Sequence, residues 1–207
     1  MTGSALQEYA RGILTRVPWE HWVVMAVVSL ALTVILLIRK KCSVYGAIAL
    51  GLTVFMGLFL LDTAVVIRYF GIMKHASGYD LTLDFSGMFQ KSGQRPVESF
   101  SNIAVFVPFG FFLAEFLAEF LAVSSAGPKS TTKRFGAWRR LGVAALTAFS
   151  LSLSIELLQL VLKVGYFEVM DLVLNTAGGF IGALMSVGRF RVKPGMRRGV
   201  GERRHWH

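Results

Sequence analysis

Five long runs of apolar residues decide what this sequence can fold into. Each is nearly free of charge and close to the roughly 20 residues that an α-helix needs to cross about 30 Å of hydrocarbon. A soluble protein could bury one such helix, but five among 207 residues would leave too little polar surface. We therefore predict an all-α membrane protein with about five transmembrane helices in one bundle. The runs are Trp22–Ile38, Val44–Leu61, Ser99–Ala114, Leu141–Ile155 and Leu172–Gly188.

The basic residues predict how the chain is oriented. They cluster after the first apolar run, between the third and the fourth, and in the C-terminal tail, which are alternate connections. Since cytoplasmic loops carry an excess of Lys and Arg, we predict a cytoplasmic C-terminus and an N-terminus outside. Attraction to anionic lipid then explains the net charge of +10, and nucleic-acid binding is not expected. The predicted divisions are 1–68 with two helices, a 69–98 outer loop, a 99–188 three-helix core and a 189–207 basic tail.

Polar residues in the last two predicted helices follow helical spacing. Each set is spaced i, i+4, i+7, i+11, so each forms one stripe along its helix. We predict that the stripes face one another, because small residues four apart let a neighbouring backbone approach closely. The same small face of Gly178 and Gly182 could also join two copies of the chain. The stripes are Ser152, Glu156, Gln159 and Lys163, and then Asp171, Asn175, Gly178 and Gly182.

Six polar residues from four helices are predicted to lie in the outer part of the bilayer. Singly, each has a structural explanation, as glue between helices or as a carboxylate at a helix start. Together they favour a binding or catalytic site, because ionisable groups in a membrane are costly unless paired, hydrated or functional. Pro108 is expected to kink the third helix beside them. The six candidate ligand-binding residues are Asp62, Asn102, Glu156, Gln159, Asp171 and Asn175.

The residue types limit the chemistry of such a site. Glu156 and Asp171 are the candidates for general acid–base catalysis, and they would equally suit binding of a cationic or amide-rich group. The sequence holds no established metal-binding or nucleophile motif, so neither a metal nor a cofactor is predicted. The four histidines are not expected to contribute. Glu115 and Glu119 share a helix face near the basic connection and are interpreted as structural.

Three motifs in the second half resemble the VanZ-like family of bacterial membrane proteins. They are Asn102-x(5)-Pro108-Phe-Gly110, Ile-Glu156-x-x-Gln159 and Asp171-x-x-x-Asn175-Thr-x-Gly178-x-x-x-Gly182, and the resemblance covers roughly residues 100–185. It implies a multi-pass protein of the bacterial cytoplasmic membrane, with Pro108, Gly110, Gly178 and Gly182 as structural positions. It also implies an association with teicoplanin resistance or other cell-envelope functions. Family members commonly have Arg where this chain has Tyr166, so Lys163 or Arg68 would have to supply the cation.

Three functions follow as hypotheses. The first is a non-enzymatic protein whose outer polar pocket binds a cell-envelope lipid, a lipid-linked precursor or a glycopeptide. The second is a membrane enzyme that uses Glu156 and Asp171 on a lipid-borne substrate. The third is a small transporter or flippase subunit, which would need a polar path to the inner face.

Overall fold

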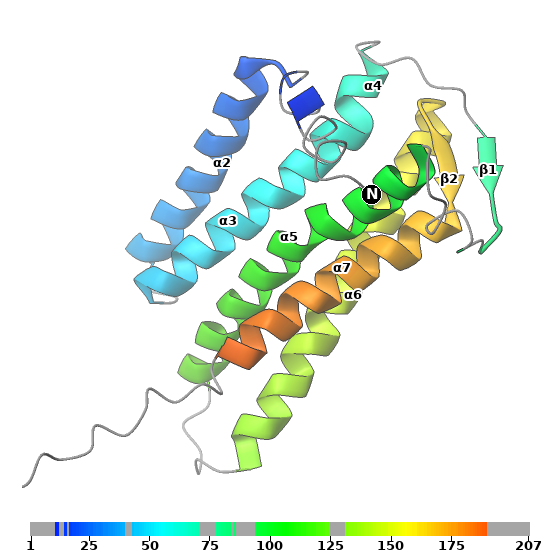
Figure 1. Cartoon of the computed structure of the whole chain (residues 1–207). Coiled ribbons are helices and arrows are strands. Elements are labelled where there is room, and N and C mark those ends of the chain that lie inside the picture. Colours follow the sequence, from blue (N-terminus) through cyan, green and yellow to red (C-terminus); the bar gives the residue numbers. More distant parts are fainter. Residues whose placement is uncertain are drawn as a thin grey trace, which may run out of the picture.

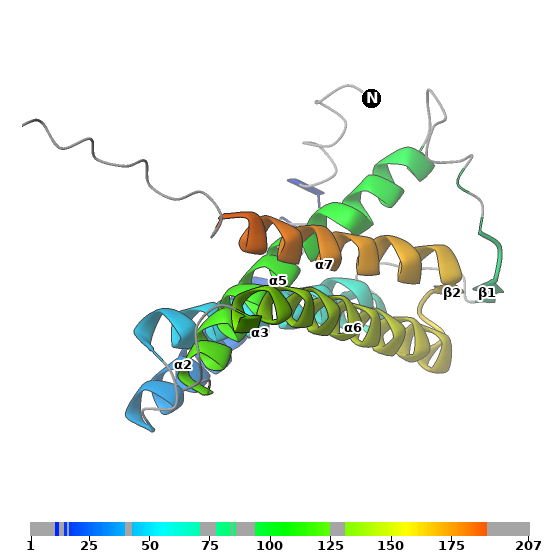
Figure 2. The same ribbon diagram turned by 90° about the horizontal axis from the view of Figure 1, so that it is seen from below.

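A computed structural model describes residues 11–12, 15, 17–39, 43–70, 78–83, 85, 94–124 and 131–189 of the chain. Its five long helices lie in one bundle, as Figures 1 and 2 show. All five are long and apolar enough to cross a membrane. The predicted fold class of a five-helix membrane protein is therefore confirmed. The spans are Trp19–Ile38, Val44–Tyr69, Glu98–Leu121, Gly136–Leu162 and Val169–Arg189.

The second span is one continuous helical segment with an irregular turn inside it. α2 covers Trp19–Ile38 and α3 covers Val44–Leu61, with the Ser43 hydroxyl capping the start of α3 at the Gly46 N–H. A π-helix, η1, follows over Asp62–Val66, and α4 completes the span over Ile67–Tyr69. Single π-turns inside helices are rare and frequently lie at functional sites.

The remaining helices are longer than the apolar runs suggest. α5 covers Gln94–Ser124 and stays helical through Pro108, α6 covers Thr131–Leu162 and α7 covers Val169–Arg189. α5 begins five residues before the predicted start, and α6 begins ten residues before it. Hydropathy marks only the part of a helix that lies in hydrocarbon, so a polar extension of the same helix escapes it.

The small face of α7 packs against α5 rather than α6. A Cβ added at Gly178 or Gly182 would overlap a backbone carbonyl of α5, so only glycine permits this approach. Gly179, on another face, lies against Ala148 of α6. The prediction that the Gly178 and Gly182 face meets the preceding helix is therefore wrong. That face is covered within one chain and is not free to join a second copy. A Cβ at Gly178 would overlap the carbonyl of Ile103, and a Cβ at Gly182 would overlap the carbonyl of Val107. In the same way, a Cβ at Gly110 of α5 would overlap the carbonyl of Gly179.

Two short strands close one end of the bundle. β1 covers Gly78–Asp80 in the connection between α4 and α5, and β2 covers Tyr166–Glu168 just before α7. They pair in parallel, with Gly78 opposite Tyr166 and Asp80 opposite Glu168. The ring of Tyr166 lies where a side chain at position 78 would be, so a larger residue there would have to displace the ring. We call this end, with β2 and the start of α7, the carboxylate end, and the opposite end the basic end.

The buried apolar side chains form two separate clusters. The larger one lies among α3, α5, α6 and α7 and includes Phe106 and Phe109, with Ala144 and Ala148 fully buried. The smaller one lies between α2 and the end of α3, around Met25 and Ile67. α2 therefore packs at the edge of the bundle, mainly on α3, as Figure 1 shows.

Candidate functional site

Glu156 is a carboxylate in the interior of the carboxylate end. It lies on α6, two turns before the helix ends, and its side chain is only 2% exposed. Its Oε2 accepts a hydrogen bond of 2.9 Å from the backbone N–H of Glu168 in β2. Among the residues described, no hydrogen bond engages its Oε1. Within the described part of the chain, the carboxylate is thus held in position through one oxygen.

Asp171 faces the same region from the first turn of α7. Its Oδ1 accepts a hydrogen bond of 2.6 Å from the Asn102 side-chain amide of α5. A carboxylate in the first turn of a helix is also stabilised by the helix dipole. Asp171 Oδ2 has no hydrogen-bond partner among the described residues. Both carboxylates are therefore placed by neutral donors, which leaves their charge uncompensated by these bonds.

One turn deeper, the two predicted stripes meet. The Asn175 side-chain amide of α7 donates to the Ser152 hydroxyl of α6 at 2.8 Å, and both residues are buried. The Asn175 Oδ1 is buried without a partner in the described part of the chain. The prediction that the stripes face one another is confirmed at this contact. Below it, Ala148 and Gly179 close the α6–α7 interface with small side chains.

Gln159 joins this region to the irregular turn of the second span. Its Nε2 donates to the backbone carbonyl of Ala64, which lies in η1, at 2.9 Å. The guanidinium of Arg68, just beyond η1, lies beside Gly165 and the Gln159 amide. It is also within electrostatic range of both Glu156 and Asp171. Of the two cations that the resemblance suggested, Lys163 and Arg68, Arg68 is therefore within electrostatic range of these carboxylates.

Lys163 does not belong to the site. It follows the last residue of α6 in a left-handed conformation, with φ of 55°, and its side chain is exposed. Such a residue commonly ends a helix, and here the N–H of Val164 turns back to the Gln159 carbonyl at 2.9 Å. Its place in the predicted stripe is wrong, because the helix ends before it.

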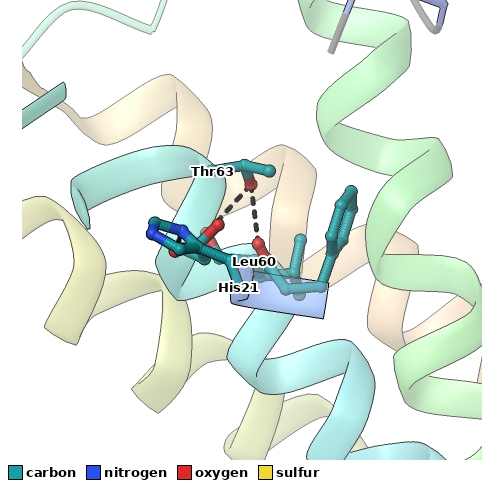
Figure 3. A network of polar contacts seen from close by, with 5 residues as sticks. His21, Leu60 and Thr63 are labelled. Carbon is teal, nitrogen blue, oxygen red and sulfur yellow. Dashed lines mark hydrogen bonds and ion pairs between the residues drawn. The ribbon is translucent and has the colours of Figure 1, made fainter. Parts of the chain in front are cut away.

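Asp62 is separate from the other predicted site residues. It is 7% exposed and pairs with His21 of α2, with 2.7 Å between His21 Nδ1 and Asp62 Oδ1. Figure 3 shows His21 beside the turn where the Thr63 hydroxyl bonds back to the Leu60 carbonyl. The described hydrogen bonds and ion pairs do not connect Asp62 directly to Glu156 or Asp171. His21 therefore pairs with Asp62, away from Glu156 and Asp171, and the expectation that the histidines do not contribute to the site chemistry stays a prediction.

The basic end has its own buried carboxylate. Glu115 of α5 is 1% exposed and accepts a hydrogen bond of 2.5 Å from the Tyr45 hydroxyl of α3. Arg140 of α6 lies within electrostatic range of Glu115, and Glu119 accepts a bond of 2.6 Å from Ser43. These contacts tie three helices together, as the structural interpretation of Glu115 and Glu119 expected.

Several elements of the carboxylate end could not be read from motifs. The backbone amide of Glu168, the position of Arg68 and the π-turn depend on how β2 and η1 each pack on α6. One signal was present for His21. A carboxylate near the outer end of a span needs a partner, and His21 lies at the matching end of the first helix.

The geometry allows binding of a polar group that carries hydrogen-bond donors or positive charge. The carboxylates of Glu156 and Asp171 can accept such donors, and Glu168 adds a third negative group within electrostatic range of both, against Arg68 as the cation. No group of three or more His, Cys, Asp and Glu side chains within the described ranges is arranged to hold a metal ion. The same two carboxylates also fit proton transfer to and from a bound substrate.

An apolar groove of about 500 Å³ runs between α6 and α7. It runs from Val169 and Leu172 along both helices to Ala145 and Phe180, and neither Glu156 nor Asp171 lines it. Its size is that of a small-molecule site. Because it lies within membrane-spanning helices, acyl chains are the molecules available to fill it. The remaining lining residues are Phe149, Val173, Thr176 and Ala177.

Comparison with known proteins gives one match. A family model described as VanZ/LLP1 matches residues 43–190, which is about seven tenths of the chain. The match covers α3 to α7 and leaves α2 outside. No curated protein and no solved structure matches.

Proposed function

This chain belongs to the VanZ/LLP1 family, and from that premise we propose that it binds the headgroup of a cell-envelope lipid or lipid-linked precursor. The site is the carboxylate end, and the setting is the cytoplasmic membrane of a bacterium. Family membership and the five apolar helices make the chain a VanZ-like multi-pass membrane protein. The proposal adds the ligand and the residues that hold it.

One observation carries the proposal. Glu156 and Asp171 come from different helices, each accept one described hydrogen bond, and both lie within electrostatic range of Arg68 and of Glu168. An ionised side chain inside a membrane costs about 2.5–3.5 kcal/mol on insertion scales unless it is paired, hydrated or functional. The two carboxylates therefore support a site for an external donor, such as an amine, amide or hydroxyl.

The apolar groove between α6 and α7 supports a lipid rather than a free water-soluble compound. An acyl chain in this groove would lie against Val169, Leu172 and Val173, on the same part of α7 that carries Asp171. Polar contacts would then select the headgroup, while burial of the chain contributes about 0.8 kcal/mol per CH₂ group. A lipid-linked cell-wall precursor satisfies the same geometry, which fits a role in the envelope or in glycopeptide resistance.

The packing of the bundle argues against transport. Between the Ser152–Asn175 contact and the buried Glu115, the described interior contains Phe106, Ala144 and Ala148, each at most 2% exposed. A membrane enzyme is the alternative. It is favoured by Glu156 and Asp171, because two carboxylates on different helices could serve as a general acid and a general base. The two functions differ in their products, because an enzyme changes the lipid and a binding protein returns it unaltered.

Copurification tests the proposal. The wild type, Glu156→Gln and Asp171→Asn are purified from membranes in mild detergent, and their lipids are identified by mass spectrometry. Glu119→Gln is the matched control, because it makes the same change at the basic end. We expect one headgroup class to be enriched with the wild type and the control and to be lost from both site variants. Enrichment that persists in both site variants would refute the proposal, and a chemically altered lipid would indicate the enzyme.

A further inference from the structure

The segment that begins with β1 exposes a run of large apolar side chains. Tyr79 is 72% exposed, Leu81 63%, Leu83 56% and Phe85 45%. Single apolar residues on a surface are ordinary, but these four fall within seven consecutive positions and alternate with polar residues. A patch of this kind marks contact with a protein or a membrane. The segment therefore has an apolar surface that the described part of the bundle does not cover.

The polar residues of the segment make local hydrogen bonds. Asp80 Oδ1 accepts the Thr82 N–H at 2.9 Å and the Thr82 hydroxyl at 2.7 Å. A polar group that already has a hydrogen-bond partner costs much less to bring into a region that is poor in water. These bonds therefore lower the cost of placing the turn after β1 against lipid.

The depth of β1 follows from its pairing with β2. α7 covers the 21 residues Val169–Arg189 and is about 31 Å long, which matches the hydrocarbon core of a bilayer. β2 directly precedes α7, and β1 pairs with β2 over Gly78–Asp80. Figures 1 and 2 show both strands at this end of α7. β1 therefore lies where α7 leaves the hydrocarbon, which is the headgroup layer.

Exposed aromatic residues mark the same level on other helices. Trp19, at the start of α2, is 70% exposed, and Tyr69 and Phe70, at the end of α4, are 57% and 71% exposed. The contact of His21 with Asp62 brings the start of α2 to this end of the bundle. Trp and Tyr are enriched at membrane–water interfaces, where one part of the ring is apolar and the other is polar. The apolar segment thus extends a belt of interfacial side chains.

We propose that residues 79–83 and 85 lie in the headgroup layer of the bilayer, with their apolar side chains in contact with lipid and Thr82 in contact with water. The partner is the lipid surface rather than a second copy or another protein, because the segment is continuous, through β2, with the membrane-spanning α7. The inference needs only the five spanning helices, so it does not depend on the proposed ligand. β2 also donates the Glu168 N–H to Glu156, so this contact with lipid adjoins the candidate site.

The accessibility of nitroxide labels tests this contact. In a chain with Cys42→Ser, a single cysteine at Leu81, Leu83 or Thr82 is labelled, and the protein is reconstituted in phosphatidylcholine nanodiscs. Relaxation of the label by oxygen, which concentrates in hydrocarbon, is compared with relaxation by a water-soluble nickel chelate. Thr82 is the matched control within the segment, and Leu30 on α2, 64% exposed, is the reference for lipid. We expect the oxygen-to-nickel ratio to be several-fold higher at Leu81 and Leu83 than at Thr82, and to approach that at Leu30.

Two results would overturn the proposal. Equal ratios at Leu81, Leu83 and Thr82 would show that the apolar side chains are not selectively in lipid. Low accessibility of Leu81 and Leu83 to both reagents would show that protein covers them, either a second copy or another chain. The ratios should be the same in Glu156→Gln, so loss of the proposed lipid ligand leaves this measurement unaffected.

Discussion

The side-chain amide of Asn102 lies 2.6 Å from the carboxylate of Asp171 and joins α5 to α7 at the mouth of the carboxylate end. The two residues are separated by 69 positions, and the bundle brings them together. Below this bond the two helices approach closely through Gly178 and Gly182. The polar contact and the glycine contacts therefore fix one helix pair, on which the candidate site is built.

The Asn102–Asp171 bond should contribute measurably to stability. Asn102→Leu removes the donor and leaves Asp171 with no hydrogen bond, so we expect a loss of about 1–3 kcal/mol. Unfolding in mixed detergent and sodium dodecyl sulfate measures the change. A double-mutant cycle with Asp171→Leu isolates the pair, since the second substitution should cost less once the first is present. Strict additivity would show that the two side chains are not coupled.

Gly182 should be intolerant of any side chain. Gly182→Ala places a methyl group onto the Val107 carbonyl, so α5 and α7 must separate, and we expect a loss of about 1–3 kcal/mol or more. Gly188→Ala is the matched control on the same helix, because a Cβ there meets nothing within 4 Å. That control should be neutral or stabilising by up to about 1 kcal/mol. Equal effects of the two substitutions would contradict the α5–α7 packing.

The fold could be predicted from the sequence because a membrane span is recognised from the apolarity of its own residues, without knowledge of the helices around it. The ends of the helices could not be predicted in this way. Lys163 and the first turns of α5 and α6 lie beyond the apolar residues, so hydropathy does not show whether they are helical. The partner of the small face was also missed. Spacing shows that Gly178 and Gly182 lie together, but it does not show whether α5 or α6 covers them.

The candidate site was predicted only in part. Glu156, Gln159 and Asp171 were placed at one end of the bundle because they flank the short turn between the last two predicted helices. Asp62 was grouped with them by depth alone, yet its lateral position places it beside His21. Depth follows from sequence, whereas the position around the bundle depends on packing.

Gln159 should hold η1 in its π-helical turn. Gln159→Leu removes the donor to the Ala64 carbonyl, which then has to find another partner in the interior. We expect faster hydrogen exchange of the amides over residues 64–69, with little change in α2. Gln159→Glu provides a comparison of similar shape without the donor. Unchanged exchange over residues 64–69 in both variants would show that η1 does not depend on this bond.

The orientation of the chain remains a prediction from the basic residues. In a protein with Cys42→Ser, a cysteine at Tyr166 should react with a membrane-impermeant reagent added outside intact cells. A cysteine at Phe135, near the basic cluster, should react only after the membrane is opened. The reverse pattern would place the carboxylate end in the cytoplasm and would exclude an outer-leaflet ligand.

Site-specific photo-cross-linking tests the central claim most directly. A photoreactive amino acid is placed at Val173, which lines the α6–α7 groove, or at Leu30 on α2, which is 64% exposed and lies away from the site. The captured lipids are identified by mass spectrometry with and without Glu156→Gln. We expect Val173 to capture one headgroup class selectively and to lose that selectivity in the variant, while Leu30 captures bulk lipid in both. Identical lipids at the two positions, unaffected by Glu156→Gln, would contradict a headgroup site at the carboxylate end.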